Sequence, residues 1–528
     1  MNFLKESEGK NITRETKNNK YYQVILAFFG VPLNYQRGFK SRYCLLYFCM
    51  CYNSPVVGKL HYDKSIFFVG TGRDLFLHVF SFTGMALNYS LKYKKLNFYN
   101  KVLLEKEGEV IIDRHSFRLK GKGARDHGET IYFGDIHEIS LAGRSVAQAL
   151  TIKCPEGSHL NEDEVIFTTF KKERYRLSNF SSLFSSFVKD FFRIRNEYLA
   201  EHLNMKVGML YKEYDGQVEI IDGSGEINNK GMARIQFYEG SMVIFPEARE
   251  CFVVYFQFMR SHEFDEEEYL LKLYLENEFT VQISKLRTHF KDARETFEML
   301  LSKMYERIVN NLKNILPEFQ SVELLKLAYL IRDGKLVNFN AIKKINEDLQ
   351  KKVEELIFQN NQLMYQKART LLNIDPNSQL HIGLLSLNKS ETHETIKSWF
   401  LCVLPASNTI AIGLCLNQRD VNIYFFRISF EEANLPVETQ NFASLHAQKI
   451  FDFNQSMFSL KYDIEPLYQE KHQLLKSRFR LLFRKLPFLR HCRTSYLGKS
   501  AASDLSFFQK EIEQFCRRAM TYYKNPKS

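Results

Sequence analysis

The sequence has few prolines, a single tryptophan and no apolar stretch long enough to cross a bilayer. It contains 11 prolines and 1 tryptophan in 528 residues, which is the composition of a globular chain rather than a proline-rich disordered one. The best apolar runs, VILAFFGVPL and YCLLYFCMCY, are about ten residues long, whereas a transmembrane helix needs about 20. Because the chain also begins with polar and charged residues, we expect no signal peptide and a soluble protein.

The cysteines show no spacing that is typical of a disulfide scaffold or a metal site. They are odd in number, 9, and are scattered from Cys44 to Cys516, which favours reduced thiols and a cytoplasmic location. Cys44, Cys49 and Cys51 form C-x4-C-x-C without a nearby histidine. We therefore interpret them as small buried residues rather than as zinc ligands.

Motifs of catalysis and nucleotide binding are also missing. LGKS, Leu497–Ser500, resembles the end of a P-loop, but Arg493 occupies the position of the first required glycine. The acidic run HEFDEEEY, His262–Tyr269, lacks the glycine turn of a calcium loop and is interpreted as a solvated hairpin tip. We expect no cofactor, no metal and no catalytic residue. An enzyme whose residues meet only in the folded chain, for example around His381 and His393, is an alternative.

The positive charge is concentrated at the two ends of the chain. The formal net charge is +12; residues 1–100 carry about +9, residues 205–318 about −6 and residues 471–528 about +11. Basic ends around a neutral-to-acidic body are typical of contact with acidic partners. We expect a protein partner, with an anionic membrane surface and nucleic acid as alternatives.

Six regions follow from the patterning. Residues 1–20 are predicted to be a disordered tail, and residues 21–103 form a basic, aromatic region with no legible fold. Because the patterning improves abruptly near Lys106, a wrongly assigned start is an alternative explanation of that region. The remaining regions are 104–204, 205–318, a helical connector at 319–372, and 373–528.

Short strands followed by an amphipathic helix occur twice. GEVIID, HSFRLKGKG, TIYFGDIHEISL, QALTIKC, EVIFTTF and RYRLSNF precede a helix whose N-cap is Ser181 or Ser182. GMARIQFYEGSMVIF, CFVVYFQFM, YLLKLYLE and FTVQISKL precede the second helix. Aligning Ser178 with Ser284 pairs Phe184 with Phe290 and Phe191 with Phe297, which indicates a duplicated unit.

The residues TIYFGDIHEISL and YRLSNFSSLFSSFV resemble the pleckstrin-homology-like superfold, including its bacterial and GRAM-type relatives. The resemblance covers roughly residues 104–204 and 228–312. It implies two curled antiparallel sheets, each covered at one end by its C-terminal helix.

The last region is predicted to combine helices with a four-stranded antiparallel meander. HIGLLSLN, SWFLCVLPA, NTIAIGLCLN and NIYFFRISF are nearly continuous in apolar residues, so helices should cover both faces. The predicted fold class is thus α+β: two PH-like units, a helical connector and an α+β domain.

Two basic clusters are candidate anion-binding sites. Arg118, Lys120 and Lys122 alternate along one strand and Arg125 follows in a turn; PH-like relatives use such residues for phosphoinositides, whereas lysines guarding a strand edge are the alternative. In LLKSRFRLLFRKLP a helix should carry its apolar side chains on one face. Its cations would then lie on an anionic membrane, bind nucleic acid, or point to water while the helix packs on the meander; they are Lys476, Arg480, Arg484 and Lys485.

These observations favour a non-enzymatic binding or scaffold protein that uses tandem PH-like units for protein or anionic-surface contact. A nucleic-acid-binding protein and an enzyme with a hidden site in the C-terminal domain are the alternatives.

Overall fold

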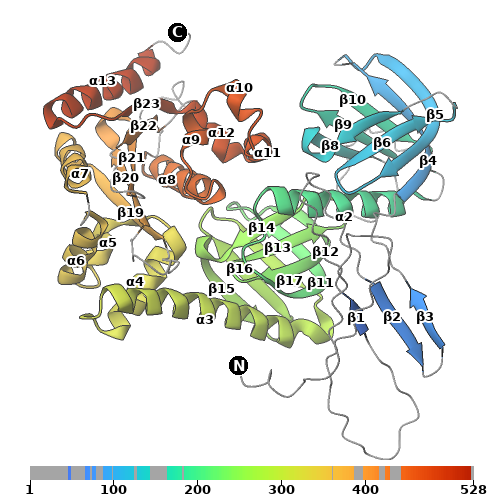
Figure 1. Cartoon of the computed structure of the whole chain (residues 1–528), viewed down its shortest axis with the longest axis horizontal. Helices are drawn as coiled ribbons and strands as arrows, with labels where there is room; N and C mark the ends of the chain where they lie inside the picture. Colours follow the sequence, from blue (N-terminus) through green and yellow to red (C-terminus); the bar gives the residue numbers. More distant parts are fainter. Residues whose placement is uncertain are drawn as a thin grey trace, which may run out of the picture.

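The computed structural model describes residues 46–48, 66–71, 74–78, 87–97, 99–123, 128–142, 163–180, 183–358, 361–385, 397–415, 422–428 and 442–524. This part of the chain is α+β and holds four antiparallel sheets, which confirms the predicted fold class (Figure 1). Several predicted features lie outside the described residues: the tail 1–20, the Cys44–Cys51 cluster, QALTIKC, Ser181, Ser182, Arg125 and His393.

The first unit is a seven-stranded sheet followed by a long helix, and it begins earlier than expected. Its strand order is β7-β6-β5-β4-β10-β9-β8. The elements are β4 (Leu87–Leu96), β5 (Val102–Ile112), β6 (Ser116–Gly121), β7 (Glu129–Tyr132), the 3-10 turn η1 (Phe133–Asp135), β8 (Ile136–Ala142), β9 (Glu164–Thr169), β10 (Arg174–Ser178) and α2 (Phe184–His202). Strand β4 pairs with β5 and β10, so the beginning expected at residue 104 is too late. The region before it also contributes a small sheet of β1 (Leu46–Phe48), β2 (Ile66–Thr71) and β3 (Asp74–His78).

The second unit repeats this topology with the order β14-β13-β12-β11-β17-β16-β15. Its elements are β11 (Leu210–Ile221), β12 (Ile227–Tyr238), β13 (Ser241–Pro246), β14 (Phe252–Tyr255), η3 (Phe256–Phe258), β15 (Met259–Asp265), β16 (Leu270–Leu275), β17 (Thr280–Ser284), η4 (Arg287–His289) and α3 (Phe290–Ile315). A 3-10 turn separates the fourth and fifth strands in both units. The shared order therefore includes an irregular element as well as the regular ones.

The aromatic packing of the two units also coincides. Phe133 meets Phe191 edge-on with ring centroids 5.7 Å apart, and Phe256 meets Phe297 in the same way at 5.6 Å. Both pairs join the 3-10 turn to the helix that closes the sheet. Phe191 and Phe297 are equivalent when Ser178 is aligned with Ser284, so the packing follows the alignment inferred from the sequence.

A polar contact obeys the same equivalence. Ser178 pairs with Lys92 and Ser284 with Gln217, which places Tyr89 and Tyr214 at equivalent positions of the first strand. The Tyr89 hydroxyl donates to Asp190 at 2.5 Å, and the Tyr214 hydroxyl lies 3.0 Å from the Thr296 hydroxyl at the equivalent helix position. Agreement in order, register and side-chain contacts makes coincidence a poor explanation, and a duplicated unit accounts for it.

The C-terminal domain is built on a six-stranded antiparallel sheet of order β18-β19-β20-β21-β22-β23. The predicted meander forms its centre, and the P-loop-like LGKS belongs to its edge strand. The strands are β18 (Val337–Asn338), β19 (Gln379–Leu385), β20 (Lys397–Leu404), β21 (Thr409–Cys415), β22 (Ile423–Arg427) and β23 (Tyr496–Ser500). The helical elements are α4 (Ser321–Ile331), η5 (Arg332–Gly334), α5 (Phe339–Lys343), α6 (Glu347–Phe358), α7 (Gln362–Ile374), η6 (Pro405–Ser407), α8 (Phe442–Ser459), α9 (Glu465–Tyr468), α10 (Lys471–Leu474), α11 (Arg480–Lys485), α12 (Pro487–Thr494) and α13 (Leu505–Lys524).

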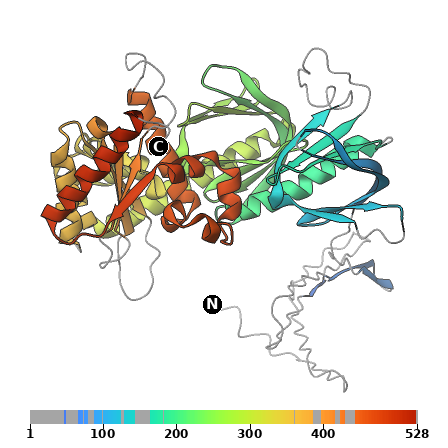
Figure 2. The same ribbon diagram turned by 90° about the horizontal axis from the view of Figure 1, so that it is seen from above.

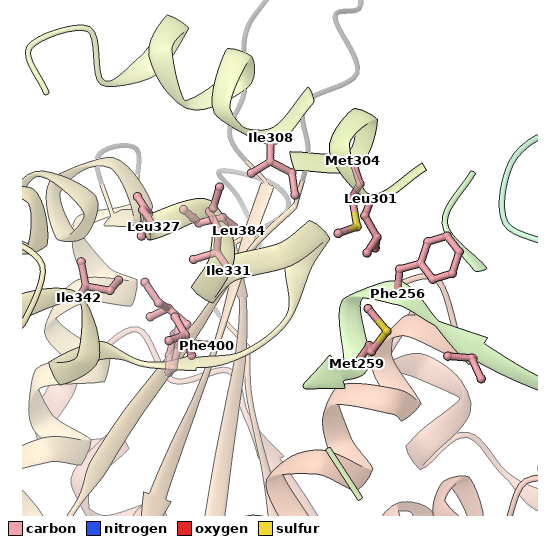
Figure 3. Close-up of a cluster of buried hydrophobic side chains, with 14 of the residues drawn as sticks. Phe256, Met259, Leu301, Met304, Ile308, Leu327, Ile331, Ile342, Leu384 and Phe400 are labelled. Carbon is pink, nitrogen blue, oxygen red and sulfur yellow. The ribbon is translucent and has the colours of Figure 1, made fainter. Parts of the chain in front are cut away.

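The second unit and the C-terminal domain share their hydrophobic cores. One cluster runs from Phe256 and Met259 through Met304 of α3 and Leu327 of α4 to Phe400 of β20 (Figure 3). A second cluster covers the other face of the six-stranded sheet and reaches the outer face of the second unit. These two parts therefore form one packed body.

The first unit keeps a core of its own. Phe187, Phe191 and Phe192 of α2 lie in that core, whereas Leu199 and Leu203 at the end of the same helix lie in the cluster shared with the C-terminal domain. In Figure 1 this helix runs from the first sheet to the second, and Figure 2 shows the second unit between the first unit and the C-terminal domain. One helix thus links two separately packed bodies.

Candidate interaction surfaces

The cations predicted on β6 face solvent, as their alternation indicates, but carboxylates stand beside them. Lys122 lies 2.9 Å from Glu107 and Lys120 lies 3.8 Å from Glu109, both on the neighbouring strand β5. The Lys122 ammonium lowers the pKa of the Glu107 carboxyl. Arg118 is exposed on the same face. These cations stand in one row of a charge ladder, and cross-strand pairing of this kind is a common way to stabilise a solvated sheet face.

The ladder continues on the other side of β5. Glu105 accepts from Lys92 at 2.5 Å and lies 3.3 Å from Lys94, both on β4. An acidic strand thus stands between two basic ones. An anion approaching β6 would have to compete with the carboxylates of β5.

The basic segment near the C-terminus is broken where one continuous helix was expected. Helix α10 ends at Leu474 and α11 begins at Arg480. Between them the Ser477 hydroxyl donates to the Leu474 carbonyl at 2.8 Å and accepts from the Phe479 amide at 3.2 Å. Such side-chain bonds to the local backbone stabilise a turn at the expense of the helix. Lys476 lies in this turn and is exposed.

The other three predicted cations of this segment contact carboxylates of the two seven-stranded units. The Arg480 and Arg484 guanidinium groups both donate to Asp135 Oδ1, each at 2.5 Å. Lys485 donates to Glu250 Oε1 at 2.8 Å. The three arrangements expected for these cations, on a membrane, on nucleic acid or in water, do not include such a carboxylate partner within the chain.

Glu250 has a second cationic partner, Arg195 of α2, whose Nη2 donates to Oε1 at 2.6 Å. Burial by itself would raise the pKa of Glu250, but Arg195 and Lys485 outweigh it and hold that pKa below its ordinary value. We call the group Asp135, Arg195, Glu250, Arg480, Arg484 and Lys485 the junction. It joins the first unit, the second unit and the C-terminal domain at one place.

The two units meet the C-terminal domain through equivalent corners. Asp135 is the third residue of η1, and Phe258 is the third residue of η3. Phe258 packs against Phe451 and Phe458 of α8, with ring centroids 5.9 and 5.8 Å away. The same corner is thus ionic in the first unit and aromatic in the second.

One end of the first sheet exposes apolar side chains. Tyr99 in the β4–β5 turn is 85% exposed and Leu103 is 59% exposed, and Val102 and Leu104 beside them are also exposed. The β9–β10 turn is adjacent, because Arg174 of β10 donates to Asn100. Lys101, Lys171 and Lys172 lie in these two turns. We call Tyr99 and Val102–Leu104 the apolar end; contiguous exposed apolar residues on a folded protein mark interaction surfaces.

A hollow of about 560 Å³ lies beside the acidic hairpin tip of the second unit. It is lined by Tyr269, Phe290, Lys291 and four other side chains. Among these, the Arg294 guanidinium pairs with both Glu266 and Glu298. One carboxylate of the acidic tip, that of Glu266, is thus paired with a cation of α3.

Groups that could support catalysis lie in unfavourable surroundings. His381 is buried in β19, and desolvation lowers its pKa to about 4. Burial raises the pKa of the Cys402 and Cys492 thiols to about 12, so neither is a reactive thiolate at neutral pH. Among the described residues no His, Cys, Asp and Glu side chains gather as a metal site would require.

In the part of the chain that the structure describes, no helix has both the length and the apolar character needed to cross a bilayer. Neither protein-family models nor curated proteins match the chain.

Proposed function

We propose that the protein is a non-enzymatic scaffold that contacts an anionic membrane surface through the first PH-like unit. The observation that supports this function is the apolar end, where Tyr99 and Leu103 are 85% and 59% exposed at one end of the sheet. The second unit and the C-terminal domain share two cores, so they would act as a rigid support for that unit.

The chemistry of the apolar end favours a lipid surface over nucleic acid. Burying an apolar side chain contributes about 1.5–3 kcal/mol, and each well-placed cation near an anionic leaflet adds about 1 kcal/mol. Lys101, Lys171 and Lys172 border the exposed Tyr99 and Leu103. Phosphates of a nucleic acid would engage the lysines but give the leucine nothing to pack against.

The experiment is co-sedimentation of the full chain with neutral and anionic vesicles at equal lipid concentration. The double variant Tyr99→Ser/Leu103→Ser should lose most of the binding to anionic vesicles. Phe507→Ser/Met520→Ser is the matched control, because it removes exposed apolar side chains from α13 instead. Absence of binding by the unaltered chain would contradict the membrane proposal, and a protein partner at the same surface would become the better candidate.

A cytoplasmic location is part of this proposal. All five cysteines whose state is described are free thiols: Cys251, Cys402, Cys415, Cys492 and Cys516. A reducing compartment suits such a set.

A further inference from the structure

Positive charge exceeds negative charge at the junction. Four cationic side chains converge there on two carboxylates, and each carboxylate uses a single oxygen to accept from two cations. Backbone carbonyls supply further acceptors: Arg484 donates to Gly134 O at 3.2 Å and Lys485 to His137 O at 3.2 Å. Carbonyl groups satisfy hydrogen bonds but do not balance charge.

Two of the four cations are buried, whereas the side chains of Arg480 and Arg484 are 41% and 19% exposed. Arg195 is 0% exposed, and the side chain of Lys485 is 7% exposed. Two nitrogens of Arg195, Nε and Nη1, are buried and have no hydrogen-bond partner. A buried guanidinium with unsatisfied donors is costly, and native proteins usually pair such donors with an acceptor, a water molecule or an ion.

Neighbouring groups do not restore the balance. Lys189 and Glu247 pair with each other at 2.9 Å. Burial raises the pKa of the Tyr198 hydroxyl and raises that of the Cys251 thiol to about 12, so both are neutral at physiological pH. Burial and the nearby Arg195 also lower the pKa of Lys485, an effect expected where cations outnumber anions.

We infer that the junction binds a small soluble oxyanion of the phosphate class, held by Arg195 and Lys485 together with the arginines of α11. Phosphate oxygens accept several charge-assisted hydrogen bonds at once, which matches the unsatisfied nitrogens of Arg195. Because the Arg195 side chain is 0% exposed, a headgroup fixed in a bilayer could not reach it. The ligand would join all three parts of the molecule, and this inference does not depend on membrane contact.

The test measures binding of inorganic phosphate and of pyrophosphate to the full chain by calorimetry, and thermal unfolding in their presence. Sodium chloride at equal ionic strength controls for screening. The unaltered chain should show saturable binding and a higher midpoint of unfolding than in chloride. Arg484→Gln/Lys485→Gln should bind about tenfold more weakly or worse, since each loses a charge-assisted donor. Lys120→Gln/Lys122→Gln loses the same charge from the ladder and should bind normally.

A second variant separates anion binding from mere destabilisation. Glu250 competes with the ligand for Arg195 and Lys485. Glu250→Gln should therefore be less stable in chloride, yet bind phosphate more tightly and gain more stability from it than the unaltered chain. The inference is overturned if neither anion binds beyond the chloride control, if both double variants lose binding equally, or if Glu250→Gln binds no more tightly.

Discussion

Replacing equivalent core phenylalanines of the two units should have different consequences, because only one unit has a core of its own. Phe191 packs against Phe117, Phe133 and Phe167 within the first unit. Phe297 packs against Phe256 in a cluster that extends to the six-stranded sheet. The perturbations to compare are Phe191→Ala and Phe297→Ala.

The size of each effect follows from complete burial. Phe191 is 1% exposed and Phe297 is 0% exposed, so each substitution removes a whole ring and should cost about 3–5 kcal/mol. In the first unit this loss of unfolding free energy affects a small cooperative body. For a body of that size, 1 kcal/mol shifts the midpoint temperature of unfolding by roughly 4 °C. The first unit should then unfold roughly 12–20 °C earlier. In the larger shared body the same free energy gives a smaller shift, of about 2–4 °C per kcal/mol.

Differential scanning calorimetry with hydrogen exchange distinguishes the outcomes. Phe191→Ala should produce a separate unfolding transition at lower temperature. Faster hydrogen exchange should then be confined to β4–β10 and the first half of α2. Phe297→Ala should lower the main transition and accelerate exchange in both the second unit and the C-terminal domain. If Phe297→Ala affected the second unit alone, the shared core drawn in Figure 3 would not be a cooperative unit, and the reasoning would be refuted.

Three further predictions concern the junction and the η1 turn beside it. Asp135→Asn, which deprives two guanidinium groups of their shared carboxylate, should cost about 1–3 kcal/mol in denaturant unfolding. The control Glu107→Gln, at an exposed ion pair, should leave the unfolding curve essentially unchanged. Because the folded state lowers the pKa of Glu250, ionised Glu250 stabilises the fold above its ordinary pKa of 4.5, and this stabilisation is lost as the pH falls below that value. In Glu250→Gln, the free energy of unfolding should therefore fall less steeply with acidification below pH 4.5. Gly134→Ala would place a methyl carbon 2.9 Å from Tyr198 Oη, so it should destabilise the fold, and Tyr198→Phe should restore part of the loss in a double-variant cycle; an equal loss with and without the hydroxyl would contradict this contact.

Local patterns in the sequence predicted the sheets, the two closing helices and their alignment, because burial imposes periods of two and of 3.6 residues. Strand β4 was missed although Tyr89, Leu91 and Tyr93 alternate with polar residues and are buried. The alternation was present, but the uniformly basic and aromatic surroundings concealed it. The meander was recognised because its strands are almost wholly apolar.

The junction could not be predicted in the same way. Arg480 and Asp135 are separated by 345 positions, and no local pattern records such a partner. The basic segment near α11 was visible, but solvent, lipid and a distant carboxylate all suit cations equally well. Only the fold shows that Glu250 lies between Arg195 and Lys485.

The unlike corners of the two copies make their assembly directional. If the copies exchanged places, the Asp135 carboxylate would face the rings of Phe451 and Phe458, and Phe258 would face the guanidinium groups of Arg480 and Arg484 with no counter-charge. Both mismatches would raise the free energy of the exchanged arrangement. The folding chain can therefore pack its two duplicated units in only one order. Divergence at a single position of a repeated turn thereby protects a tandem protein from misassembly with its own copy.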